Sequence, residues 1–149
     1  MMLYGAFPSL EVPMDILLKP VMEFRAPIVE VRKVPTGTPV SYGGVFTTES
    51  ESTIGVIQCG FADGIPRPWY QNGHVMFKGG KYKIAGRICM DQFMVDFEGQ
   101  EPHVGEEVLI MGDGADGCVR MEEIARSINS TPYVISTGIS GRTRRIYQV

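Results

Sequence analysis

Three short clusters of polar and glycine residues interrupt the apolar stretches of this chain, and they hold the side chains that could do chemistry. They cover residues 40–44 (VSYGG), 60–67 (GFADGIPR) and 86–92 (GRICMDQ). Tyrosine, arginine, aspartate and cysteine can all donate, accept or hold a proton. Polar groups beside buried segments need partners, and loops gathered at one end of a scaffold often carry a site. The sequence therefore predicts one site built from three loops.

Taken singly, the residues of these clusters favour simpler interpretations. Tyr42 alone reads as a tyrosine at the end of a strand, and an ordinary phenol, with a pKa near ~10, becomes a base at neutral pH only among cationic groups. Met90 alone indicates core. No histidine lies near Cys89 to support a thiolate nucleophile, and Arg87 and Asp91 resemble surface charges. Only the ordered set of clusters points to catalysis.

Composition excludes several classes of function. The net charge is −3 and the isoelectric point is near 5.4, which argues against binding to nucleic acid or to an anionic membrane. No apolar run reaches the length of a membrane span. Three widely spaced cysteines and two isolated histidines favour neither a disulfide framework nor a metal site. We expect a cytoplasmic protein without a bound metal.

The elements that must position the clusters are predominantly strands. We expect strands over 21–34, bent near Pro27, and over 53–59, 93–97 and 107–111, followed by late strands over 133–136 and 143–147. Gly79-Gly80 predicts a two-residue hairpin turn between strands 74–78 and 81–85. Apolar residues on one face predict a single helix over 121–128. The fold class is mainly β, a small Greek-key-like β-barrel with one short helix at about 120–128.

The first twenty residues differ from the remainder of the chain. Pro8, Pro13 and Pro20 interrupt their apolar stretches, which indicates a connector. We therefore expect two parts, a connector over residues 1–20 and a β-domain over residues 21–149. A chain of 149 residues is long enough for one domain with a core, but too short for an α/β barrel and a second domain together.

The three clusters, in this order and spacing, resemble the C-terminal domain of alanine racemases, which are fold-type III pyridoxal-phosphate enzymes. The resemblance covers nearly the whole chain. It implies that residues 1–20 end a barrel domain that holds the cofactor and its lysine. The implied activity is two-base interconversion of L- and D-alanine, a cell wall precursor. Tyr42, of the Ser-Tyr-Gly motif, is implied to be the base for L-alanine.

The same resemblance assigns roles to the other cluster residues. The backbone N–H of Met90 is implied to bind the substrate carboxylate. Gly141 occupies a position where many racemases have a tyrosine that contacts the cofactor phosphate. The implied entrance and pocket wall consists of Phe61, Arg67, Arg87, Cys89, Asp91 and Ile139. The intact enzyme is implied to be a head-to-tail homodimer in which this domain completes the partner subunit's barrel site, so that the isolated chain is inactive.

Three alternatives remain at this point. A fold-type III decarboxylase uses a Cys-Asp pair, but here Met90 separates Cys89 from Asp91. A β-barrel interaction module could keep this scaffold without the chemistry. Serine could replace alanine as substrate, because Phe61 and Gly141 stand where better-known racemases have tyrosines, and the loss of the second tyrosine opens space beside the substrate side chain.

Overall fold

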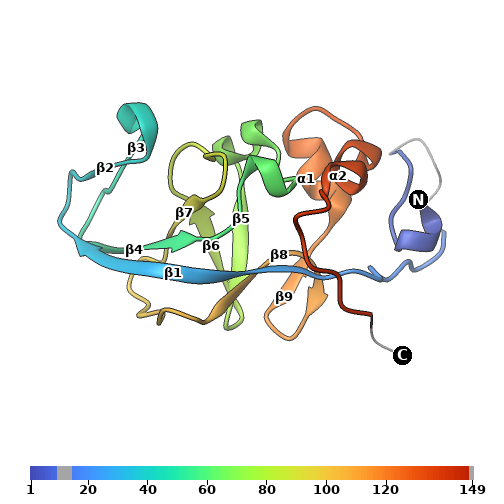
Figure 1. Ribbon diagram of the computed structural model, residues 1–149, viewed down its shortest axis with the longest axis horizontal. Coiled ribbons are helices and arrows are strands. Elements are labelled where there is room, and N and C mark those ends of the chain that lie inside the picture. The colour runs from blue at the N-terminus through green and yellow to red at the C-terminus, as the bar shows by residue number, and fades with distance from the viewer. Residues whose placement is uncertain (10–14, 148–149) are drawn as a thin grey trace.

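The structure, a computed structural model, describes residues 1–9 and 15–147. Its strands are β1 (Phe24–Val34), β2 (Pro39–Val40), β3 (Phe46–Thr47), β4 (Ser52–Ile57), β5 (His74–Phe77), β6 (Gly80–Ile84), β7 (Phe93–Asp96), β8 (Glu107–Gly114) and β9 (Gly117–Val119). Two α-helices follow them, α1 (Met121–Ser127) and α2 (Pro132–Gly138). Short 3₁₀ helices are η1 (Met2–Tyr4), η2 (Tyr42–Gly44), η3 (Phe61–Asp63) and η4 (Arg67–Gln71) (Figure 1).

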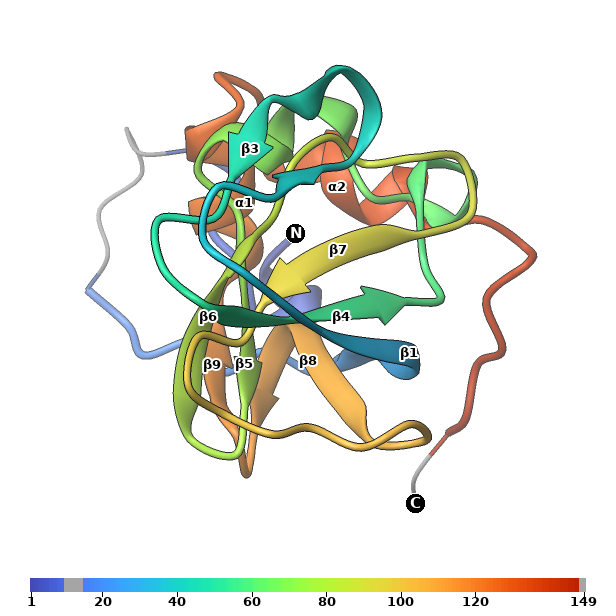
Figure 2. The ribbon, with the colours of Figure 1, turned by 90° about the vertical axis from the view of Figure 1, so that its left-hand side faces the viewer.

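Six strands close into an antiparallel barrel in the order β1-β4-β7-β6-β5-β8, and β8 pairs back with β1 (Figure 2). Closure depends on β1, which changes partner along its length. Its first part, Phe24 to Pro27, pairs with β8, while Ile28 to Val34 pairs with β4. The change falls at Pro27, where a bend was predicted, because proline interrupts the ladder. The mainly β barrel predicted from the sequence is confirmed.

Alternating side chains fill the barrel. Phe93, Val95 and Phe97 are fully buried, whereas the intervening Met94 and Asp96 are only half-buried. Gly55 provides room for the ring of Phe97, since a Cβ there would lie 2.5 Å from the Phe97 ring. The alternation of side chains along β7 therefore determines which of its residues enter the core.

The predicted hairpin exists, but its turn lies one residue earlier than expected. Phe77 pairs with Gly80, so the two-residue turn is Lys78-Gly79 and not Gly79-Gly80. Both turn residues have positive φ, 48° and 79°, as a primed turn requires. Gly80 belongs to β6, where a Cβ would lie 2.5 Å from the Tyr82 hydroxyl oxygen.

Helix α1 confirms the predicted helix, but the prediction of a single helix is wrong. Residues 133–136, predicted as a strand, lie in α2, which begins at Pro132 and buries Pro132 and Ile135. Proline in the first turn is a helix start signal, and packing of α2 on α1 outweighs the strand preference of its branched residues. Residues 143–147 form no strand either.

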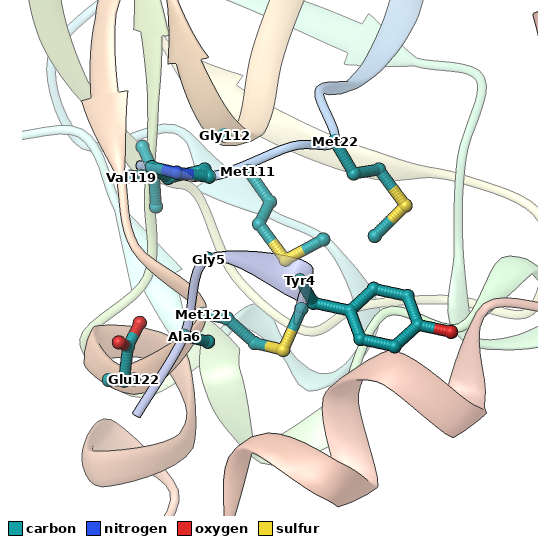
Figure 3. A pocket seen from close by; sticks show the side chains of 10 residues that line it. Tyr4, Gly5, Ala6, Met22, Met111, Gly112, Val119, Met121 and Glu122 are labelled. Carbon is teal, nitrogen blue, oxygen red and sulfur yellow. The ribbon is translucent and has the colours of Figure 1, made fainter. Parts of the chain in front are cut away.

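The described parts of the first twenty residues fold back on the β-domain. The N–H of Phe7 donates to Glu122 Oε1 at 2.9 Å, and Arg120 donates to the carbonyl oxygens of Gly5 and Leu18 at 3.0 and 3.2 Å. Between this segment and the barrel lies a small pocket with methionine side chains around it, shown in Figure 3. Pro13, one of the three connector prolines, lies outside the described residues.

Candidate active site

The three clusters meet at one end of the barrel, together with the chain that follows α2. This end is the upper one in Figure 2, where η2 and α2 lie. We call it the site end. Hydrogen bonds and ion pairs join its parts: residue 41 bonds to residue 87, residues 61 and 62 bond to residues 89 and 90, and residue 142 pairs with residues 63 and 91. The sequence prediction that the clusters converge is therefore confirmed.

Tyr42 projects from a short arm that leaves β1 and returns at β4. The arm is fastened to the barrel by the Ser41 hydroxyl, which donates to the Arg87 carbonyl oxygen at 2.8 Å. The Arg87 guanidinium lies over Gly43, since a Cβ at Gly43 would be 3.0 Å from Arg87 Nη1. The Tyr42 side chain is 73% exposed. The Arg87 guanidinium thus lies against the residue that follows Tyr42, while the phenol itself is accessible.

The second and third clusters lie against each other through their backbones. The N–H of Phe61 donates to the Cys89 carbonyl oxygen, and the N–H of Ala62 donates to that of Met90, each at 2.9 Å. Gly60 allows this approach, because a Cβ there would lie 2.4 Å from the Met90 oxygen. The two loops form one rigid unit.

Met90 presents a free backbone donor on this unit. Its carbonyl accepts from Ala62, whereas its N–H has no acceptor among residues 1–9 and 15–147. The neighbouring Cys89 N–H is satisfied by the Gln92 carbonyl oxygen at 2.9 Å. Met90 is 59% exposed, so the residue lies at the surface and not in the core. A free N–H of this kind can bind a carboxylate.

Arg142 ties the loops together and was not identified from the sequence. Its Nη2 donates to Asp91 Oδ1 at 2.7 Å, and its Nε lies 3.4 Å from Asp63 Oδ1. Asp63 in turn accepts the Gly60 N–H at 2.9 Å. Hydrogen bonding to Asp91 raises the pKa of the Arg142 guanidinium, so this bridge stays charged. The sequence did not reveal this role, because Arg142 lies far along the chain from both aspartates and no local motif marks a residue that acts across the fold.

The remaining predicted residues take different positions around this end. Phe61 is half exposed on η3, and Ile139 is half-buried against the core. Arg67 is exposed on η4, and within the described chain its guanidinium has no ion pair or hydrogen-bond partner. Gly141 is exposed, with open space where a side chain would extend. Within residues 1–9 and 15–147, no hydrogen bond or ion pair joins any of these four to Tyr42.

Two cysteines lie at the site end: Cys59 is buried and Cys89 is half-buried. Burial, with the Asp63 carboxylate nearby, raises the pKa of the Cys59 thiol to about 12, so that it stays protonated at neutral pH. Cys89 is half-buried, and its sulfur lies 3.7 Å from the Arg87 carbonyl oxygen. Neither is arranged with a base as a nucleophile would be.

The site end contains no side chain that could carry a carbonyl cofactor. No lysine occurs in residues 40–47, 59–71, 86–92 or 138–147. Among the described residues no three His, Cys, Asp or Glu side chains gather to hold a metal ion, and no helix there is long and apolar enough to span a membrane. The chain thus offers a phenol, a free N–H and cations, but no cofactor attachment.

Residues 21–147 match the family model described as alanine racemase, C-terminal domain. The chain belongs to this family. An alanine racemase of Streptomyces coelicolor is 42% identical over 147 residues, which are 97% of this chain and 38% of that protein. One from Desulfosudis oleivorans is 38% identical over 97% of this chain and 38% of its own length.

Solved alanine racemase structures share the fold. The enzyme from Streptomyces lavendulae superposes with a TM-score of 0.91 at 40% identity, covering 99% of this chain and 39% of that one. The Bartonella henselae enzyme, solved with covalently bound pyridoxal phosphate, gives 0.87 at 32% identity, covering 99% of this chain and 40% of that one. This alanine racemase domain therefore spans about two-fifths of the length of the relatives it matches.

Proposed function

We propose that this chain is the C-terminal domain of a pyridoxal-phosphate-dependent alanine racemase and supplies the base that acts on L-alanine. The observation that carries the proposal is the site end itself. An exposed phenol and an unoccupied Met90 N–H lie on loops held together by hydrogen bonds, with the Arg87 guanidinium against Gly43, in a domain of the racemase family. A phenol and a carboxylate-binding donor are the groups that proton transfer at an amino acid Cα requires.

In this proposal Tyr42 and Met90 have separate tasks. Tyr42 Oη removes the Cα proton of L-alanine and returns a proton to the same face in the reverse reaction. The Met90 N–H holds the substrate carboxylate and so fixes which face of Cα meets the phenol. Pyridoxal phosphate, when bound, supplies the electron sink for the carbanion. A lysine of the barrel domain serves the opposite face.

The other site-end residues shape access to the pocket. Phe61, Arg67 and Arg87 form the entrance, where unpaired guanidinium groups attract a carboxylate. Cys89, Asp91 and Ile139 complete the wall. The open space at Gly141 leaves room beside the substrate side chain, and a slightly larger amino acid such as serine is the alternative substrate.

The complete site requires a second domain. Tyr42, Phe61 and Met90 are exposed at the site end, as are Tyr133 and Val134 of α2. Exposed apolar groups in one region are typical of a docking surface. We propose that the barrel domain of a partner subunit covers them in a head-to-tail homodimer, and that the cofactor is bound mainly by that barrel. The isolated chain is then inactive.

Complementation tests this proposal. A separately produced barrel half of a racemase relative, loaded with pyridoxal phosphate, is mixed with this chain and supplied with L-alanine. D-alanine should form only when both halves are present. Tyr42→Phe should abolish the product, whereas Tyr147→Phe, at another exposed tyrosine, should leave it unchanged. A folded mixture that co-purifies but makes no D-alanine or D-serine would refute the racemase.

A non-catalytic interaction module is the second candidate. It is favoured by the missing side chain at Gly141, a position where many racemases have a tyrosine. This candidate predicts that partner binding persists and that Tyr42→Phe changes nothing that can be measured in the mixture.

A further inference from the structure

Ser41 has a backbone conformation that serine rarely adopts. Its φ is 66° and its ψ is 177°. The left-handed region that non-glycine residues occasionally visit has ψ near ~45°, and the combination found here is occupied almost only by glycine. Such conformations persist only where the surrounding structure enforces them, and they concentrate at functional sites.

Contacts on both sides of Ser41 enforce this conformation. Val40, immediately before it, is buried against Ile54 and Ala85. The Ser41 hydroxyl is bonded to the Arg87 carbonyl oxygen at 2.8 Å. Gly86, at φ 85°, allows the approach, because a Cβ at Gly86 would lie 2.6 Å from that of Ser41. The serine is thus held between a buried strand residue and the third cluster.

The strained residue determines where the next one points. Ser41 is the single residue between β2, which ends at Val40, and η2, which begins at Tyr42. Its φ and ψ therefore set the direction in which Tyr42 leaves the strand. The hydroxyl bond joins this turn to the segment that carries Met90, four residues after Gly86.

We propose that Ser41 is a positioning residue for Tyr42, and that its hydroxyl, anchored on the Arg87 carbonyl, holds a strained turn that directs the phenol toward the Met90 segment. The catalytic meaning of this placement depends on the function proposed above. The anchoring itself is a property of this chain and is tested without any activity.

The test measures thermal unfolding and amide relaxation of the 149-residue chain carrying Ser41→Ala or Ser41→Gly. Alanine keeps the strain and loses the hydroxyl, whereas glycine relieves the strain as well. We expect Ser41→Gly to melt about 2–4 °C above Ser41→Ala. In both variants the Tyr42 amide should gain microsecond–millisecond exchange broadening, while amides of β7 stay unchanged. If Ser41 only stabilised the fold, the more stable variant, Ser41→Gly, would show no added exchange broadening at the Tyr42 amide.

Ser50 provides the matched control. It is exposed on the same arm, its hydroxyl bonds only to the adjacent Glu51 carbonyl at 3.4 Å, and its φ is not positive. There glycine should melt below alanine, the ordinary order, because glycine loses more entropy on folding. The proposal is overturned if Ser41→Gly melts below Ser41→Ala, or if Tyr42 relaxation is unchanged in both. Failure of the racemase proposal would appear separately, as a complemented wild-type mixture without turnover.

Discussion

At the end of the barrel opposite the site end, aromatic and charged groups have their packing and hydrogen-bond partners within the chain. The rings of Phe77, Tyr82 and Phe97 pack together with centroid distances of 5.2 to 6.4 Å. The turns around them are tight, and Asp116 accepts both from Arg25 at 2.7 Å and from the Lys78 N–H at 2.8 Å. Figure 2 shows these hairpins at the lower end. Nothing there requires a second molecule.

At the site end, aromatic and charged residues of the same kinds lack such partners within the described chain. Phe61 and Tyr42 face outward, and the guanidinium groups of Arg67 and Arg87 have no ionic partner within the described chain. The Met90 N–H has no acceptor there either. The contrast teaches that the opposite end stabilises the fold, while the site end keeps groups without partners in this chain, as the proposed docking of another domain and a substrate requires.

Replacing one phenylalanine at each end of the barrel tests this contrast most sharply. Phe97→Ala should lower the free energy of unfolding by about 3–5 kcal/mol, because it empties a fully buried position. Phe61→Ala, at a half-exposed position, should cost less than about 1 kcal/mol. Urea unfolding of both variants measures the difference. Equal losses would mean that the site end is part of the stabilising core and would break the comparison.

Acid should weaken the opposite end first. Hydrogen bonding to Arg25 lowers the pKa of Asp116, so its contribution to stability is present above the unfolded value of ~3.8 and is lost as the pH falls through the lower folded value. Asp116→Asn should cost about 1 kcal/mol at pH 7 and flatten the decline in stability below pH 4. Urea midpoints between pH 2.5 and 7 test this. An unchanged pH profile would show that the Asp116–Arg25 ion pair does not contribute to the loss of stability in acid.

The Arg142 bridge should matter for order and little for stability. The Arg142 side chain is 53% exposed and solvent screens its ion pairs, so Arg142→Gln should change the free energy of unfolding only slightly. Hydrogen exchange of the Ala62 amide should nonetheless accelerate, because the bridge joins both loops that this hydrogen bond connects. Arg144→Gln is the control. A matching acceleration in the control would show that net charge, and not the bridge, controls the loops.

The smallest predicted effect concerns substrate choice in the complemented enzyme. Gly141→Tyr fills space that is open in this structure. We expect the ratio of serine to alanine turnover to fall by about 10-fold, the usual effect of crowding a pocket by a few atoms. Steady-state rates with both amino acids give this ratio. An unchanged ratio would place Gly141 away from the substrate side chain.

The sequence predicted the parts of the fold that local chemistry decides. The strand expected over residues 93–97 is present as β7 (Phe93–Asp96), and Pro27 marked the bend of β1. The helix α2 was missed because its branched residues favour strands, while the tertiary contact with α1 that decides the outcome is not a local property. The turn at Lys78 was misplaced by one residue because either of two adjacent glycines could supply positive φ.

The candidate site divides in the same way. The motifs indicated Tyr42 and Met90, since the order of the clusters is visible in the chain. Ser41 and Arg142 were not singled out, because a strained φ and an ion pair across 51 residues appear only when the backbone is folded. Sequence therefore pointed to the proposed reactive groups, whereas the residues that hold their loops became visible only in the fold.

Exchange of the Cα hydrogen for solvent deuterium tests the central claim most directly. The complemented enzyme with Tyr42→Phe is given L-alanine and D-alanine separately. If Tyr42 is the base for L-alanine, its exchange should fall by at least about 10²-fold while D-alanine still exchanges through the lysine on the other face. Undiminished exchange of L-alanine by the variant would contradict the account.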